Sequence, residues 1–188
     1  GGWAGREGNS DPYYTSFALR TLAVTGELYG SRAESAAGFL RSRLDKQETV
    51  VDLAALIYGA SLLENAAGID VFEKVGIQWE DSVTDFFETL RRDDGGYAKS
   101  ASSNVGSTYN SFLVLLCREL MERPLKNANP LIQFIFDQET DTGGGFREVQ
   151  QQKRAGTNPT AAAIGILKIL DALDDELRDD TINFLGEM

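Results

Sequence analysis

The sequence predicts an all-α fold of four helix-hairpin repeats, because a glycine-aromatic motif recurs with a regular period and helical apolar patterns follow it. Two glycines precede an aromatic residue at Trp3, Tyr97 and Phe146. These aromatics are 94 and 49 residues apart, and 94 is twice 47, so we expect a fourth, eroded copy near residues 47–51. Strand-like alternation is absent, although residues 144–152 could pair as a brief ribbon.

Each repeat contains a glycine-bearing loop, a first helix rich in small and apolar residues, and a second helix with a single apolar stripe. The first helices are expected at 13–28, 50–66, 108–122 and 159–173, and the second helices at 32–44, 77–91, 127–138 and 177–187. A helix that is apolar on all sides is buried, whereas a striped helix covers it. We therefore expect an inner and an outer helix layer in a single domain that spans residues 1–188.

Helix starts are marked by proline and by capping residues. Pro159 suits the first turn of a helix, with Asn158 or Thr157 as its cap. Pro130 indicates that the seventh helix begins near Asn129. Ser107 and Thr108 can cap the third inner helix in the same way.

Composition excludes several function classes. The chain has 18 Lys+Arg and 29 Asp+Glu, a net charge of −11, which argues against nucleic acid or an anionic membrane surface as a partner. It has no histidine, which removes His-based acid/base catalysis, the Ser-His-Asp triad and most zinc sites. The single Cys117 lies in an apolar run, which favours a buried structural thiol.

The sequence contains no obvious targeting signal. Its apolar runs are shorter than a bilayer requires, and the opening residues lack the apolar stretch of a signal peptide. We expect a cytoplasmic location. The first residue is glycine rather than methionine, which suggests a fragment of a longer chain.

The opening Gly-Gly-Trp-Ala-Gly-Arg of residues 1–6 and the Asp-Pro-Tyr-Tyr-Thr-Ser-Phe of residues 11–17 resemble a signature of protein prenyltransferase β subunits. Residues 91–97 resemble that repeat and also the Gln-Trp motif of squalene and other terpene cyclases. The resemblance implies the α/α-toroid fold of this superfamily. It implies a partial toroid, because a closed ring has more helix pairs than the four that can be recognised here.

The resemblance implies a domain like the β subunit of farnesyl or geranylgeranyl transferase, but without its zinc site. In that family an Asp and a Cys of the signature and a later His hold zinc. Asp11 matches the Asp, Tyr13 stands in place of the Cys, and the region of the His reads Asn158-Pro159-Thr160. We therefore expect no metal or cofactor and no zinc-dependent transfer, and Asp11 and Tyr13 are the remaining catalytic candidates.

The resemblance also implies an isoprenoid or other hydrophobic ligand. Arg6 matches the arginine that contacts the isoprenoid diphosphate, and Tyr14 matches a neighbouring tyrosine. The lysine that usually lies between Arg6 and Asp11 is absent. Tyr109 and Asn158 are expected at the same rim if the inner helices run parallel. Two roles remain open for Arg6, which could form a salt bridge with Asp11 or bind an anion.

Structural interpretations compete with the functional ones. Asp11 and the acids at 174–180 are at positions typical of helix caps and first turns. The aromatics of the three motifs could join neighbouring repeats or stack on a ligand. The alternative to a ligand-binding domain is a non-catalytic helical-repeat interaction module. In either case the first and last repeats would expose apolar flanks, which predicts a homodimer or docking to another domain or chain.

Overall fold

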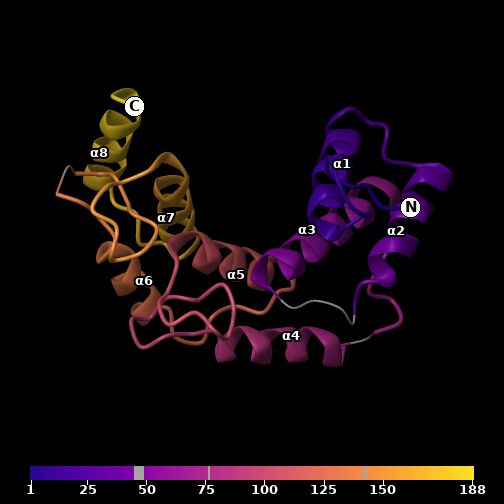
Figure 1. The fold of residues 1–188 in the computed structure, drawn as a ribbon, viewed down its shortest axis with the longest axis horizontal. Helices are drawn as coiled ribbons and strands as arrows, with labels where there is room; N and C mark the ends of the chain where they lie inside the picture. The colour runs from indigo at the N-terminus through magenta and orange to yellow at the C-terminus, as the bar shows by residue number, and fades with distance from the viewer. Residues whose placement is uncertain (45–48, 76, 142) are drawn as a thin grey trace. The chain divides into compact units, whose positions relative to one another are not determined.

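The computed structural model describes residues 1–44, 49–75, 77–141 and 143–188. Within these residues it contains eight α-helices and no strand, and only isolated β-bridges occur outside the helices (Figure 1). The helices are α1 (Pro12–Val24), α2 (Gly30–Arg41), α3 (Val50–Ala67), α4 (Ile77–Thr89), α5 (Thr108–Leu120), α6 (Asn129–Phe136), α7 (Thr157–Ile169) and α8 (Asp175–Gly186). The all-α prediction is confirmed, and every helix overlaps the range expected from the sequence.

The helix starts confirm most of the expected caps and correct one of them. The carboxylate of Asp11 accepts the Tyr14 N–H at 2.8 Å, and Ser107 Oγ accepts the Asn110 N–H at 3.1 Å. Helix α6 begins at Asn129, as Pro130 indicates. The expected cap of α7 at Asn158 or Thr157 is wrong. The N-cap is Gly156, which has no side chain that could accept a hydrogen bond from the helix N-terminus.

The chain forms two compact units, and each is described by itself. Unit 1 comprises Gly1–Asp85 and Cys117–Arg123, and unit 2 comprises Phe86–Leu116 and Pro124–Met188. A single domain spanning 1–188 stays a prediction.

Unit 1 is built on α3. Helices α1 and α2 both pack on it, and α3 is buried on most sides, as expected for an inner helix. Leu19, Leu40 and Leu63 form part of the core between these helices and are fully buried. By length and composition α3 could cross a membrane, but half of it is buried inside the protein, which is typical of a core helix.

Helix α1 departs from the expectation that the first helices are apolar and buried on most sides. It buries Thr15, Ser16 and Leu19 on one face, but Tyr13, Tyr14 and Phe17 are exposed on the other. The physical reason is that α1 packs on α3 with one face, and no other described helix packs extensively on it. Exposed apolar side chains are what the sequence predicts for a first repeat, and α8 in the last repeat likewise exposes Ile182 and Leu185.

The three Gly-Gly motifs make the same contacts with the second helix of their own repeat. The first glycine lies against helix backbone, and the second lies against a phenylalanine ring four residues further along that helix. The pairs are Gly1 with Ser35 and Gly2 with Phe39 in unit 1, and Gly95 with Pro130, Gly96 with Phe134, Gly144 with Asp180 and Gly145 with Phe184 in unit 2. A β-carbon at the second glycine would lie 2.6–2.7 Å from the ring. The motif therefore fixes each loop to the second helix of its own repeat.

The aromatic residue after each glycine pair is fixed to the first helix by two hydrogen bonds. Its N–H donates to a hydroxyl in the first turn of that helix, and its carbonyl accepts the N–H of the N-cap residue. The N–H bonds are Trp3 to Thr15 Oγ1 (2.9 Å), Tyr97 to Ser111 Oγ (2.8 Å) and Phe146 to Thr160 Oγ1 (2.9 Å). The N-cap donors are Asp11, Ser107 and Gly156, at 3.0–3.1 Å. The sequence repeat is therefore also a structural repeat in these three copies.

The eroded copy was expected near residues 47–51, of which 47 and 48 lie outside the described residues. Thr49 is described and caps α3, because its hydroxyl accepts the Asp52 N–H at 3.2 Å. The helix start is thus kept in this copy, although its sequence has no Gly-Gly pair.

The hydroxyl at the start of α7 gives a direct test of the structural repeat. Replacing Thr160 with Val removes the acceptor of the buried Phe146 N–H, which is expected to lower the free energy of unfolding by about 1–3 kcal/mol. Urea denaturation followed by circular dichroism measures this loss. Thr160→Ser keeps the hydroxyl and is expected to lose much less, so equal losses in the two variants would contradict the role of the hydrogen bond.

Two of the three motif aromatics are buried completely. Tyr97 and Phe146 have no exposed surface, which excludes stacking on a ligand. The Tyr97 hydroxyl donates to Glu88 of α4 at 3.0 Å, so this ring joins the preceding second helix to its own repeat. Within residues 144–152, where the sequence allowed a brief ribbon, the structure has only an isolated bridge from Phe146 to Glu139.

Candidate functional site

The structure divides the expected ligand-binding residues between the two units. Arg6 and Tyr14 belong to unit 1, whereas Tyr109 and Asn158 belong to unit 2. The two pairs are therefore described separately.

Three aromatic side chains of α1 form an exposed cluster, called here the α1 aromatic cluster. The Tyr13 ring meets Tyr14 edge-on at 5.4 Å and Phe17 edge-on at 5.0 Å between centroids. The three residues are 40%, 45% and 51% exposed. Their positions at i, i+1 and i+4 place them on one side of the helix, opposite Leu19 in the core. This cluster is an apolar surface open to solvent.

The loop that carries Arg6 lies against this cluster. A β-carbon at Gly5 would come within 2.5 Å of the Tyr14 ring, so the loop backbone contacts that ring directly. The loop is also tied to α1 by the hydrogen bond from Trp3 to Thr15. Arg6 follows Gly5 and is exposed. The backbone at Arg6 is thus held close to the aromatic cluster, and the Arg6 side chain is exposed to solvent.

The salt-bridge alternative for Arg6 is not observed. The Asp11 carboxylate caps α1, and among the described residues Arg6 has no ion pair within 4.0 Å. The catalytic candidates Asp11 and Tyr13 have local structural roles, since Asp11 is the cap and the Tyr13 carbonyl accepts the Ser16 hydroxyl at 2.7 Å. In the described chain neither is hydrogen-bonded to a titratable side chain.

In unit 2, Tyr109 and Asn158 lie at the starts of α5 and α7. The Glu148 carboxylate occupies the start of α5, where it accepts the Ser107 hydroxyl and the Tyr109 N–H at 3.3 Å. A carboxylate at this position satisfies the helix N-terminus and repels a second anion. Asn158 is exposed in the first turn of α7, after the exposed Lys153 and Arg154.

A cavity that sequence reasoning did not identify lies in unit 1. It has a volume of about 340 Å³ and lies between α3, residues 70–73, residues 79–80 and the end of α5. Its lining combines apolar and acidic side chains, which are Ile57, Ser61, Glu64, Asp70, Phe72, Glu73, Trp79, Glu80, Leu120 and Met121. We call it the acidic cavity. The only sequence signal was the alternation of acidic and aromatic residues at 70–73 and 79–80, which has no regular period.

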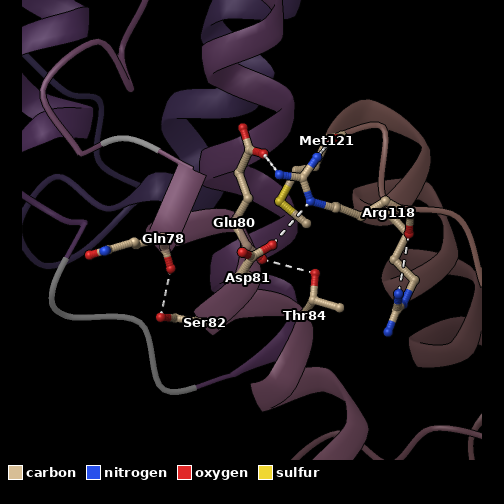
Figure 2. A network of polar contacts seen from close by, with 8 residues as sticks. Gln78, Glu80, Asp81, Ser82, Thr84, Arg118 and Met121 are labelled. Carbon is tan, nitrogen blue, oxygen red and sulfur yellow. Dashed lines mark hydrogen bonds and ion pairs between the residues drawn. The ribbon is translucent and has the colours of Figure 1, made fainter.

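The geometry of the acidic cavity is set by an aromatic stack and an arginine. Phe72 and Trp79 stack with centroids 4.6 Å apart and planes 26° apart. Arg123 pairs with Glu80 at 2.7 Å and with Asp81 at 3.2 Å, and Figure 2 shows this network beside Met121. These contacts hold the start of α4 against the chain that follows α5.

Other reactive groups include the single cysteine and the acidic side chains. Cys117 is buried, and its burial raises the pKa of the thiol far above its ordinary value, so it is not a nucleophile in the folded chain. In the part of the chain that the structure describes, no three His, Cys, Asp or Glu side chains converge as metal ligands.

Comparison with known proteins identifies no relative of this chain. Searches with family models, among curated proteins and among solved structures find no match to this chain.

Proposed function

We propose that this chain is a partial α/α toroid of the prenyltransferase and terpene-cyclase type, with inner and outer helix layers. In this proposal it binds an isoprenoid or another hydrophobic ligand and performs no zinc-dependent transfer. The observation that carries the proposal is the α1 aromatic cluster, which is exposed and lies against the loop that contains Arg6. A cytoplasmic location is part of the same proposal.

The aromatic cluster supplies the apolar part of the interaction. When a ligand covers one of these rings, apolar surface is removed from water, which contributes about 25 cal/mol per Å² to the free energy of binding. The edge-on contacts of Tyr13 with Tyr14 and Phe17 fix the three rings relative to one another, so covering them costs little side-chain entropy. An extended isoprenoid chain matches such a surface because it is flexible and apolar throughout.

Arg6 supplies the polar part. A guanidinium donates two parallel hydrogen bonds to phosphate oxygens, and it is always charged. The first turn of α1 is already capped by Asp11, whose carboxylate repels another anion at the helix axis. The diphosphate is therefore expected on the loop side, at Arg6.

Calorimetric titration of the full chain tests this proposal. Farnesyl and geranylgeranyl diphosphate are expected to bind, and Arg6→Ala is expected to weaken farnesyl diphosphate roughly tenfold while leaving farnesol unchanged. Phe17→Ala is expected to weaken both ligands. Arg154→Ala, an exposed arginine of unit 2, is the matched control and is expected to change neither. Absence of binding by all three ligands would overturn the proposal.

A second candidate function, a helical-repeat interaction module, is favoured by the exposed side chains of α8. Ile182 and Leu185 lie three residues apart and are 60% and 42% exposed. Exposed apolar surface of this kind is suited to contact with a second copy of this chain or with another chain. Light scattering separates the two functions, because a stable dimer that fails to bind isoprenoids would favour the module.

A further inference from the structure

The acidic cavity carries an inference that is independent of the isoprenoid proposal. Four carboxylates line it, from Glu64, Asp70, Glu73 and Glu80. The lining itself contains no lysine or arginine. Glu64, Asp70 and Glu73 are exposed, so they form an acidic rim beside the apolar part of the lining.

Two arginines lie near the rim, and only one of them forms an ion pair with a lining carboxylate. Arg123 reaches Glu80 but is shared with Asp81, which lies outside the lining. Arg41 contacts the backbone carbonyl of Asp70 at 2.6 Å rather than its carboxylate. Within the described residues Glu64 and Glu73 form no ion pair. At least two carboxylates are thus left to attract a cation from solution.

The interior determines which kind of cation fits. Ile57, Leu120 and Met121 provide aliphatic surface, and the stacked Phe72 and Trp79 provide aromatic surface. Such surface attracts an alkyl chain, and aromatic rings also attract an ammonium group. The lining carboxylates do not converge as the ligand group of a metal ion. A volume of about 340 Å³ lies at the lower end of the range of small-molecule sites.

We infer that the acidic cavity binds a small organic cation that carries an ammonium group on an aliphatic chain. The alkyl chain lies against the apolar and aromatic lining, and the ammonium group lies at the rim near Glu64 and Glu73. An anion of the same shape is repelled, and a neutral analogue gains only the apolar contacts.

Three ligands of the same length test the inference on the full chain: hexylamine, 1-hexanol and hexanoate. Binding is measured by calorimetry and by the change in tryptophan fluorescence, since Trp79 lines the cavity. Hexylamine, which is protonated at pH 7, is expected to bind roughly tenfold more tightly than 1-hexanol, with hexanoate weakest. Equal binding of the amine and the alcohol would overturn the inference.

Variants separate the cavity from general attraction by a chain of net charge −11. Glu73→Gln and Glu64→Gln are each expected to weaken hexylamine roughly threefold or more. Glu34→Gln, an exposed glutamate of α2 outside the lining, is expected to leave it unchanged. If Glu34→Gln weakens hexylamine as much as Glu73→Gln does, the site is not the acidic cavity and the inference fails.

Discussion

Replacing Gly95 with Ala is expected to lower the free energy of unfolding by about 3 kcal/mol or more. Gly95 has a φ of 90°, which side-chain-bearing residues rarely adopt. In addition, its β-carbon would overlap the backbone carbonyl of Pro130 in α6. Both contacting atoms belong to the main chain, so no rotamer change relieves the overlap. Urea denaturation of the full chain, followed by circular dichroism, measures the loss.

Gly143→Ala is the matched control for this substitution. Gly143 also has a positive φ, of 71°, but nothing lies within 4 Å of its β-carbon position. Gly143→Ala is expected to lower the free energy of unfolding by only about 1 kcal/mol, which is the cost of placing a residue with a side chain in this backbone conformation. Equal losses at the two positions would show that the contact of the loop with α6 contributes nothing.

The sequence predicted the helices well because their signals are local. Period and apolar pattern located all eight helices, and Pro130 gave the start of α6. The function of the glycine pairs could not be predicted, since each pair meets a helix nearly forty residues further along the chain. The structural role of this conspicuous sequence motif is therefore visible only in the folded chain.

The candidate site was predictable only in part. Arg6 and Tyr14 were identified from a motif, and the structure places their loop and helix in contact through Gly5. The aromatic exposure of α1 depends on what covers the helix, which its own residues do not specify. The acidic cavity is formed by side chains from α3, residues 70–73, residues 79–80 and the end of α5, and no single segment of these shows a regular pattern.

Phe134→Ala is expected to lower the free energy of unfolding by about 3–5 kcal/mol. The Phe134 ring is fully buried in unit 2 and lies against both Gly96 and Gly106, so its removal opens a cavity between α6 and the Gly-Gly loop. Phe136→Ala, two residues away on the same helix, is the control. Phe136 is 38% exposed, and its replacement is expected to cost clearly less. A similar cost at both positions would contradict this role of the Gly-Gly motif.

A double-mutant cycle separates the contact of Gly96 from its backbone conformation. Gly96 has no positive φ, and the atoms nearest its β-carbon position belong to the Phe134 ring, at 2.6–2.7 Å. Gly96→Ala is therefore expected to lower the free energy of unfolding strongly when Phe134 is present and much less in the Phe134→Ala background. The expected coupling energy between the two substitutions is about 1 kcal/mol or more. Additive losses would mean that the ring does not select the glycine. Because the same pair recurs as Gly2 with Phe39 and Gly145 with Phe184, a measured coupling would give the motif a physical cause in all three repeats.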